Sequence, residues 1–560
     1  MDLLTCVCLA AIEAKVITFF FPTVLSTEAW PFAIWNAVSL FLLQYFTLKC
    51  YRILVHPVYF SPLRHLPGPT DNHFFLGQAL RLLWAETPTS LYVQWMRENP
   101  DAPVIRYLSF ANSEVLVVNS IHAHKALLQT NCYDFRKPDT LRRMVKEIVG
   151  NGIFMLEGEI HRARRKMLAA SFSNPQIRKH QPIFQRVARQ LGGVFDQAID
   201  CNTHDAVGVV DCRKVFCRAT LDIIAETALG IELSHLRVTT SAYQPSAKPG
   251  SGSGYTFHQA YDTLFTQRFA SKVLLWANAF VPTRWIPVKA NHDFLFATIW
   301  LRDVLTGLVR DRYCVLSEIV ASDAQAKRES PDLLTYLVTE SRPGGPAEGI
   351  SEDELVGHLL QFMVAGHETS AMALVWSVYV MATKQDIQSK LRTEVVELLP
   401  HAVDPTAAEL DSLPYLNGFV KEILRLYSPA TLMYREAAVD VNLDGVFVPK
   451  GTTVEMVPSV TMRNPHIWGE DVDVVDPSRW NHLTGDQHSP YAFEAFSNGP
   501  RICIGRSFAL LEIKTILVEM VRHYRFLYVA KPFSVGNPSL ILRPTSLQVA
   551  VQKLGKQTDA

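Results

Sequence analysis

The sequence predicts a mainly α-helical protein with small β-sheets, an α+β fold class, preceded by an N-terminal transmembrane helix. Three observations support this. Residues 155–430 carry a largely helical pattern, β-branched strand-like segments lie on either side of it, and residues 29–48 contain no charged side chain. A composition with 48% hydrophobic and 19% charged residues allows a large core and excludes a disordered chain.

Charge and cysteine usage exclude further classes of protein. Lys and Arg together number 54, and so do Asp and Glu, so no basic excess supports a nucleic-acid partner. The nine cysteines include no CxxC pair of the kind that binds zinc. We expect most of them to be small buried residues.

Residues 1–55 are predicted to be a membrane anchor. Residues 29–48 are about long enough to cross a bilayer, whereas an earlier apolar stretch, 16–25, is too short to span alone, which leaves one or two spans open. Basic residues follow the span and acidic residues precede it: Lys49, Arg52 and Arg64 against Asp2, Glu13 and Glu28. The positive-inside rule then places the downstream body in the cytosol, as on the endoplasmic reticulum. A cleaved signal peptide is disfavoured because no basic n-region is present.

The body is expected to follow a Pro-rich extended tether at residues 56–70. Residues 71–560 then form one domain, interrupted by a flexible Gly- and Ser-rich insertion at about 240–254. A strand pair is expected at 103–110 and 113–120.

A long helix is predicted from Ser351 to about Lys384, opened by a capping box between Ser351 and Glu354, and it should be the longest of the chain. Beyond Pro429 the pattern predicts short strands and then a last helix from about Ile504.

The segment FSNGPRICIG contains the most informative cysteine. Glycines and a proline surround Cys503, and a strong helix-forming run follows, so its sulfur should lie at a tight turn before a helix. Peptide N–H groups and the positive helix end there favour a thiolate, which is a suitable ligand for haem iron.

This segment resembles the haem-binding loop of the cytochrome P-450 family, FxxGxRxCxG, at all five positions: Phe496, Gly499, Arg501, Cys503 and Gly505. The resemblance covers roughly residues 60–550 and implies the cytochrome P-450 fold with haem b as cofactor. It implies that Cys503 is the axial ligand of the haem iron, that Arg501 binds a haem propionate, and that Phe496 packs beside the ring and shields the sulfur.

Two further segments match the family. Glu422 and Arg425 form its ExxR pair on one helix face, and Arg479 in DPSRW completes a Glu-Arg-Arg network. In this family the network is a scaffold, and each buried charge needs its partners.

The segment AGHETS resembles the family's oxygen-activating motif, with Glu in place of the commoner Asp and Ser370 in place of Thr. Glu368 and Thr369 are then the catalytic residues, which supply the protons needed to cleave the O–O bond. Gly366 is expected to leave room for dioxygen.

The segment EGEIHRARRKMLAASFS resembles the family's C-helix. His161 takes the place of the usual Trp there and Arg165 is its partner, both facing a propionate; Arg435 is a further propionate candidate. Outward basic residues of this helix are expected to receive an acidic flavoprotein reductase.

The resemblance implies a monooxygenase that takes electrons from NADPH through a cytochrome reductase, with cytochrome b5 as a second donor, and inserts one oxygen atom of O2 into a lipophilic molecule. Segments 144–154, 359–364, 430–434 and 536–540 are the expected pocket lining. YDFRKP and the membrane anchor resemble fungal members that build secondary metabolites such as terpenoids.

Two alternatives remain open from the sequence. One is an isomerase or dehydratase that uses a peroxide substrate, against which Glu368 and Thr369 argue. The other is a non-catalytic membrane haem-binding protein.

Overall fold

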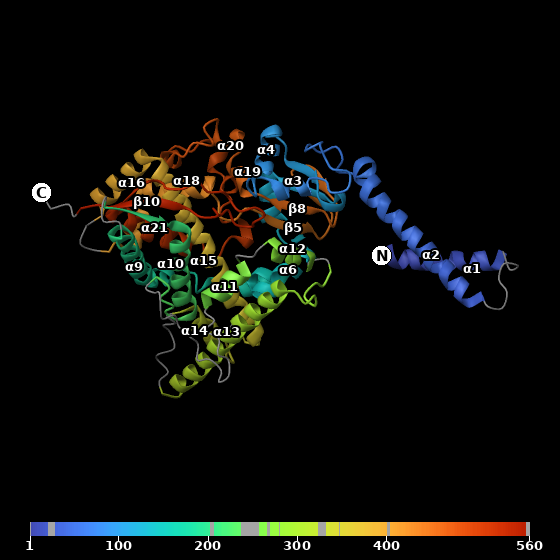
Figure 1. The fold of residues 1–560 in the computed structure, drawn as a ribbon, viewed down its shortest axis with the longest axis horizontal. Helices are drawn as coiled ribbons and strands as arrows, with labels where there is room; N and C mark the ends of the chain where they lie inside the picture. The colour runs from blue at the N-terminus through green and yellow to red at the C-terminus, as the bar shows by residue number, and fades with distance from the viewer. Residues whose placement is uncertain are drawn as a thin grey trace.

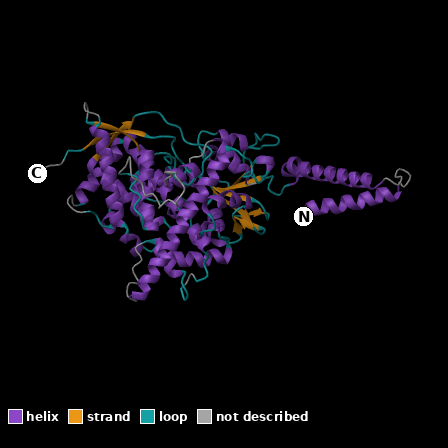
Figure 2. Ribbon diagram, turned by 60° about the horizontal axis from the view of Figure 1, so that its bottom comes forward, coloured by secondary structure: helices purple, strands orange, loops and turns teal. Residues whose placement is uncertain are grey.

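The computed structural model describes residues 2–20, 29–201, 206–236, 257–265, 269–278, 281–322, 332–345, 348–399 and 404–555. Within them, helices build the body and strands gather in small sheets at two sides of it (Figure 1, Figure 2). The predicted mainly helical fold class is confirmed. The expected insertion at about 240–254 lies outside the described residues.

Two apolar helices, α1 (Asp2–Phe20) and α2 (Ala29–Cys50), lie side by side and project from the body (Figure 1). A π-helix, η2 (Tyr51–Phe60), continues α2 and contains Pro57. The expected extended tether is therefore wrong for residues 56–60, which are helical although Pro57 offers no backbone N–H. By length and composition, one helix of the described chain, Ala37–Phe60, could cross a membrane.

Helix α15 (Glu352–Thr383) passes through the centre of the body, close to its predicted bounds. Ser351 caps it by accepting a hydrogen bond from the Glu354 N–H (3.2 Å). Only this half of the predicted capping box forms, because the Glu354 carboxylate binds Arg164 instead (2.6 Å). Helix α13 (Lys289–Ser322), with 34 residues, is longer than α15, with 32, so α15 is not the longest helix.

Most of the remaining helices enclose one large apolar core, to which α10, α15 and α21 contribute many fully buried side chains, while α3, α4, α5, α19 and α20 pack in two smaller clusters with the strands of the N-terminal sheet. The longer ones are α4 (Ser90–Glu98), α6 (Asp139–Val149), α7 (Gly158–Ala169), α9 (Gln181–Asp200), α10 (Cys212–Leu229), α11 (Phe257–Phe265), α12 (Phe269–Asn278), α14 (Leu333–Glu340), α16 (Gln385–Leu398), α18 (Pro414–Leu426) and α21 (Arg506–His523). The short ones are α3 (Ala79–Trp84), α5 (Ile121–Lys125), α8 (Asn174–Lys179), α17 (Ala407–Asp411), α19 (Pro458–Met462) and α20 (Pro465–Trp468).

A five-stranded sheet lies toward the N-terminal helices (Figure 1). Its order is β1 (Val104–Leu108), β2 (Glu114–Val118), β8 (Thr453–Met456), β5 (Met433–Ala437) and β3 (Phe135–Arg136). The pair β1–β2 is antiparallel, as predicted, with Val104 opposite Val118, while β2 and β8 are parallel. The sheet carries Arg435 on β5 toward the functional site.

A second sheet lies on the far side of the body, and a hairpin completes the strands. The sheet has the order β4 (Val207–Asp211), β10 (Gln548–Lys553), β9 (Tyr524–Val529), and the hairpin joins β6 (Val441–Leu443) to β7 (Val446–Val448). Strand β4 interrupts a region that was expected to be helical. Its pairing partner, β10, lies more than 300 residues away, so local periodicity could not indicate it.

Candidate functional site

The loop around Cys503 forms the tight turn that the sequence predicts. The Cys503 N–H donates to the Phe496 carbonyl (2.9 Å), and α21 begins at Arg506. Gly499 has a φ of +69°, and a Cβ there would lie 2.1 Å from the Leu128 carbonyl oxygen. Only glycine satisfies both conditions, so this turn, and with it the position of the sulfur, depends on Gly499.

The Cys503 side chain is accessible, although protein atoms surround it on most sides. Burial raises the pKa of its thiol, and the Gly505 N–H, Arg165 and Arg506 only partly oppose this. In the protein alone, desolvation by burial thus acts against the helix end that was expected to favour a thiolate. Coordination to a metal deprotonates a thiol outright.

Five basic side chains gather beside this loop, and we call them the cation cluster: Lys137, His161, Arg165, Arg435 and Arg501. Glu157, the N-cap residue of α7, lies among them. It accepts a hydrogen bond from Lys137 Nζ (2.9 Å) and forms an ion pair with Arg501. Four of the five were predicted; Lys137 and the role of Glu157 were missed.

Positive charge exceeds negative charge in the cation cluster. Burial and the neighbouring Arg435 lower the pKa of Lys137 to about 8, while burial and Arg501 lower the pKa of His161 to about 4. Burial, followed by Arg501, lowers the pKa of Arg435 to about 10, and its guanidinium donates to the Tyr434 carbonyl (2.9 Å). Among the residues that the structure describes, no carboxylate forms an ion pair with Arg435 and the buried Arg501 Nε has no hydrogen-bond partner.

These features fit haem. An accessible cysteine sulfur at a helix start suits its iron, and a buried cluster with more cations than acids suits its two carboxylates. A half-exposed stretch of α15 also fits: Ala365 is exposed, in a helix that is otherwise largely buried. Cys503 would hold the iron, and members of the cation cluster would hold the carboxylates.

Thr369 lies on this accessible stretch of α15. Its hydroxyl donates to the Ala365 carbonyl (2.6 Å), one turn back along the helix. Gly366 does not have the expected role, because a Cβ there would lie 2.8 Å from Ile224 of α10. This glycine allows two helices to pack closely; it does not make room for dioxygen.

Glu368 is buried and pairs with Arg543, whose Nη1 donates to Glu368 Oε1 (2.9 Å). Arg543 follows the segment 536–540 and was not predicted. A second acid was also missed: burial raises the pKa of Glu512, on α21, to about 8, although the nearby Ser370 of α15 acts to lower it. Both acids therefore adjoin the AGHETS segment, one ion-paired and one buried among apolar side chains.

The Glu-Arg-Arg network forms as predicted from the motifs. Glu422 and Arg425, both 0% exposed, form two hydrogen bonds of 2.7 and 2.9 Å. Arg425 also donates to the carbonyls of Met462 and Val472. It thus ties α18 to the chain that follows α19.

Arg479 joins the network more weakly through Glu422 Oε1 (3.4 Å) and binds Asp471 by two hydrogen bonds of 2.7 and 3.0 Å. Trp480 Nε1 donates to Glu422 Oε2 (3.0 Å). Asp471 and Trp480 were missed, because a short motif names only its own residues. Together these bonds fix the irregular segment before the Cys503 loop.

The other basic residues of α7 point in different directions. Arg162 is exposed, pairs with Glu159 (2.6 Å) and lies over the Tyr133 ring, while Lys166 is exposed and Arg164 binds Glu354 of α15. Two of the basic side chains, Arg162 and Lys166, therefore face solvent.

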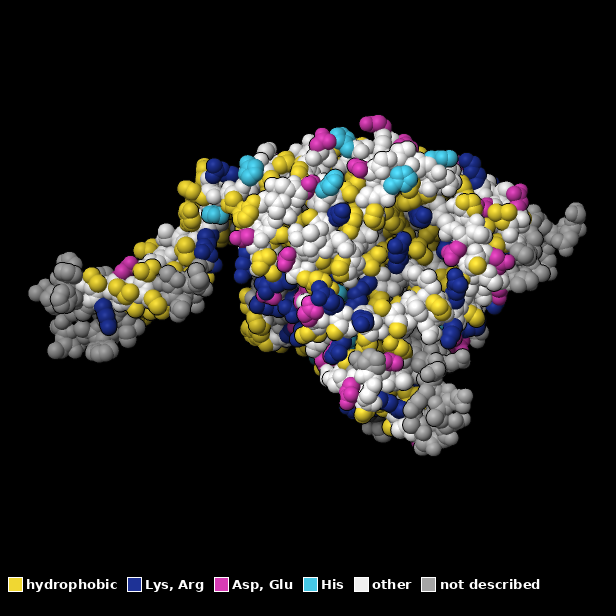
Figure 3. All heavy atoms as spheres, turned by 180° about the vertical axis from the view of Figure 1, so that it is seen from behind, with side chains coloured by type: hydrophobic (Ala, Val, Ile, Leu, Met, Phe, Trp, Pro, Cys, Tyr) yellow, Lys and Arg dark blue, Asp and Glu magenta, His cyan; other side chains and the backbone are white. Residues whose placement is uncertain are grey.

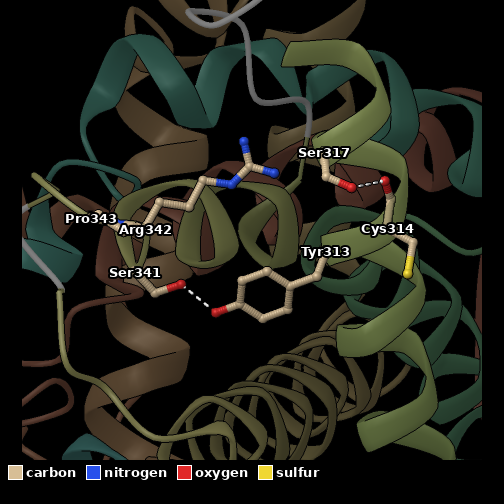
Figure 4. Close-up of a pocket in the computed structure, with 6 residues that line it drawn as sticks. All are labelled: Tyr313, Cys314, Ser317, Ser341, Arg342 and Pro343. Carbon is tan, nitrogen blue, oxygen red and sulfur yellow. Dashed lines mark hydrogen bonds between the residues drawn. The ribbon is translucent and has the colours of Figure 1, made fainter. Parts of the chain in front are cut away.

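A surface hollow away from these residues lies between α13 and the chain after α14 (Figure 4). Its lining is Tyr313, Cys314, Ser317, Ser341, Arg342 and Pro343. The Tyr313 hydroxyl and Ser341 Oγ lie 2.5 Å apart across it. None of the predicted site residues lines this hollow, which is widely open to solvent.

Comparison with known proteins agrees with this geometry. The family model described as Cytochrome P450 matches residues 66–551. The relatives include Cytochrome P450 monooxygenase sphH of Aspergillus fumigatus, 29% identical over 85% of each chain, and Cytochrome P450 monooxygenase FUM15 of Gibberella moniliformis, 28% identical over 84% of each. Cytochrome P450 monooxygenase FSL4 of Gibberella zeae is 28% identical over 87% of this chain and 85% of its own.

The chain belongs to the cytochrome P450 family. It is a haem-binding monooxygenase, an oxidoreductase that acts on a small molecule with electrons from a redox partner. These relatives come from fungi, as the resemblance predicted.

Proposed function

We propose that this enzyme inserts one atom of O2 into a lipophilic small molecule, by hydroxylation or a related oxidation, in the biosynthesis of a terpenoid-like secondary metabolite. The observation that carries the proposal is the accessible Cys503 sulfur beside a cation cluster that contains a single acid, Glu157, within the described part of the chain. When bound, haem supplies the activation of O2 with two electrons. The monooxygenase names of the relatives favour this function over a peroxide-using isomerase or a non-catalytic haem protein.

Each member of the site has a proposed task. Cys503 Sγ ligates the iron, and Phe496, whose carbonyl accepts from the Cys503 N–H, shields the sulfur. Arg501, Arg435, His161 and Arg165, together with Lys137, bind the two carboxylates of haem b. The Glu422–Arg425–Arg479 network keeps the Cys503 loop in place without touching the reactants.

Thr369 and Glu368 are proposed to deliver protons. The Thr369 hydroxyl donates to the Ala365 carbonyl, which leaves its oxygen free to accept a hydrogen bond from water. To deliver a proton, the hydroxyl turns from this carbonyl toward the exposed stretch of α15, gives up its own proton there and takes one from the water. The Glu368 carboxylate is held by Arg543 and must leave this pair to exchange protons with Thr369.

Replacement of the Thr369 hydroxyl tests its proposed role in proton delivery. For Thr369→Ala we expect NADPH oxidation to continue while product falls about tenfold or more and hydrogen peroxide accumulates. The measurement is the ratio of product to NADPH consumed. An unchanged ratio would refute proton delivery through Thr369; Thr383→Ala, which removes a similar hydroxyl-to-carbonyl bond at the exposed end of α15, is the control.

Hydrogen bonds join the four segments that were expected to line the pocket into two pairs, which supports a shared pocket for a lipophilic substrate. Thr431 binds the carbonyls of Leu540 and Ser539 (3.1 and 3.0 Å), which joins 430–434 to 536–540, and Gln361 joins 359–364 to 144–154. Most of these residues are apolar, as in pockets for apolar ligands. Co-expression with a fungal reductase, followed by screening of lipophilic extracts for products heavier by one oxygen atom, tests this assignment.

We further propose that the electrons come from NADPH through a membrane-bound cytochrome reductase, with cytochrome b5 as an accessory donor. Arg162 and Lys166 offer exposed positive charge on α7, next to the cation cluster, to an acidic partner. Turnover that needs NADPH but no reductase would contradict this route.

We also propose that α1 and α2 anchor the enzyme in the endoplasmic reticulum, with the catalytic domain in the cytosol. Apolar side chains are highly exposed along α2, including Trp35, Leu43 and Phe46 (62–69%). Figure 3 shows hydrophobic side chains on the surface of the projecting arm. The Gln44 side-chain amide donates to the Glu13 carboxylate, which joins α2 to α1 through polar groups inside the apolar arm. This pairing favours two embedded helices over one.

Deletion of residues 1–55 should move most of the protein from the membrane fraction to the supernatant.

A further inference from the structure

A tyrosine of the segment YDFRKP, which has no role in the proposed function, lies against the cation cluster. Tyr133 stands in the turn before β3 and is half-buried. Its hydroxyl oxygen lies 3.4 Å from His161 Nδ1, and the guanidinium carbon of Arg501 lies 5.1 Å from the centre of its ring. The guanidinium carbon of Arg162, which is exposed on α7, lies 4.6 Å from the same ring centre. One side chain therefore contacts two members of the cluster.

The contact between Tyr133 and His161 decides which ring nitrogen of the histidine carries a proton. Burial and the neighbouring Arg501 lower the pKa of His161 to about 4, so its ring is neutral near pH 7 and carries one proton. The Tyr133 hydroxyl needs an acceptor, and the two guanidinium groups beside its ring can only donate. His161 Nδ1 is the acceptor that the structure places next to it, so the ring proton lies on Nε2. Within the described part of the chain, Nε2 forms no hydrogen bond of its own.

The Tyr133 ring acts on Arg501 through its aromatic face. Such a face attracts a guanidinium by its negative electrostatic potential and leaves the N–H groups free to donate. The two Nη atoms of Arg501 reach Glu157 and the Leu156 carbonyl (3.5 Å), while its buried Nε has no partner among the described residues. A buried N–H without an acceptor costs free energy, so an anionic ligand that accepts from Nε would remove this cost.

We propose that Tyr133 is a positioning residue for haem binding: its hydroxyl keeps the His161 proton on Nε2 and its ring holds the Arg501 guanidinium, so that both side chains donate to the haem carboxylates. The proposal deepens the proposed function and rests on it, because these carboxylates belong to haem bound at Cys503. Without the hydroxyl, the histidine proton can move to Nδ1, and Nε2 would then turn a lone pair toward a carboxylate. Tyr133 acts through its two neighbours and is not a catalytic residue.

The first test separates the hydroxyl from the ring. Tyr133→Phe removes only the hydroxyl, and we expect haem to pass from the full-length protein to an acceptor apoglobin about threefold faster. Tyr133→Leu also removes the aromatic face, and we expect an acceleration of about tenfold. Tyr313→Phe is the matched control, because it removes a half-buried hydroxyl that contacts Ser341 away from the cation cluster. A wild-type rate of transfer in Tyr133→Leu would overturn the proposal.

The second test determines whether the hydroxyl acts through His161. In that case Tyr133→Phe should accelerate haem transfer about threefold in the wild type and leave the rate of His161→Leu unchanged, because the nitrogen that the hydroxyl orients is then absent. Equal acceleration in both backgrounds, or acceleration in neither, would overturn the proposal.

The third test is a spectroscopic signature that a general loss of stability would not produce. The bending mode of the haem carboxylates in the resonance Raman spectrum responds to hydrogen bonds from the protein. We expect this mode to shift in haem-loaded Tyr133→Phe and to stay in place in Tyr313→Phe. An unshifted mode in Tyr133→Phe would show that the hydroxyl does not control the donors to the carboxylates, and would overturn the proposal.

Failure of this proposal is distinguishable from failure of the proposed function. If the proposed function is wrong, the wild-type protein would lack the thiolate Soret band of the reduced carbon monoxide complex. If only the role of Tyr133 is wrong, that band is present in the wild type, and Tyr133→Phe and Tyr133→Leu retain haem as the wild type does.

Discussion

Two groups of buried charges in this enzyme differ in how completely their members are paired. In the Glu422–Arg425–Arg479 network, both guanidinium groups bind carboxylates and carbonyls. In the cation cluster, Glu157 is the acid that pairs with Lys137 and Arg501, and Arg435 donates only to a carbonyl among the described residues. Since an unpaired buried charge costs several kcal/mol, the first group is complete by itself, and the second needs an anionic ligand.

The comparison predicts its largest effect at Glu422. Glu422→Gln leaves Arg425 buried without a carboxylate, so we expect the free energy of unfolding to fall by about 3–5 kcal/mol and haem content to fall with it. Thermal unfolding and the haem-to-protein absorbance ratio measure both.

The control for this variant is Glu352→Gln, which breaks the solvent-exposed pair with Arg310 and should change little. If Glu422→Gln is as stable as Glu352→Gln, the network is not a scaffold.

In the cation cluster, removal of a charged side chain should not lower the free energy of unfolding of the haem-free protein. Arg435→Gln removes a half-buried cation that lacks a carboxylate partner, so we expect the haem-free protein to be as stable as the wild type or more stable. Haem should nevertheless dissociate about tenfold faster, because one charge-assisted hydrogen bond to it is lost.

Transfer of haem to an acceptor apoglobin measures the rate, with Arg136→Gln on the neighbouring strand as the control. Loss of apoprotein stability with normal haem retention would show that the cluster is structural.

A buried acid that has no cation partner among the described residues provides a further test. Glu455 of β8 accepts a hydrogen bond from the Tyr107 hydroxyl (2.9 Å), and burial raises its pKa from 4.5 to about 7. Between these values the unfolded chain releases a proton that the folded chain retains, so stability falls as pH rises through this window.

Glu455→Gln removes this titration and should unfold at a temperature that declines less between about pH 5 and pH 7 than in the wild type. Tyr107→Phe, which keeps the acid, should retain the decline. Identical pH profiles of wild type and Glu455→Gln would mean that Glu455 is ionised in the fold.

Short motifs allowed much of the site to be predicted from the sequence. Phe496 to Gly505, Glu422, Arg425 and the helix at 352–383 lie close to where local pattern placed them. Residues that act through distant partners were missed: Lys137 meets Glu157, and Arg543 meets Glu368, across 20 and 175 positions.

The expectations that differ from the structure were each based on the local preference of one residue. In the folded protein, contacts with distant segments changed the outcome. Gly366 packs against Ile224 of another helix, and burial opposes the helix end at the Cys503 thiol. Pro57 lies inside a helix, although its missing N–H and fixed ring favoured an extended chain. The excess of positive over negative charge in the cation cluster likewise could not be predicted, because it arises only when segments from α7, β5 and the Cys503 loop lie together in the fold.

The central claim, that Cys503 is the haem ligand, is tested most directly by the spectrum of the reduced carbon monoxide complex of purified full-length protein. We expect the thiolate Soret band in the wild type and in Cys314→Ser, which changes an exposed cysteine of α13, and no such band in Cys503→Ala. A thiolate band that persists in Cys503→Ala, or wild-type protein that binds no haem, would contradict the claim.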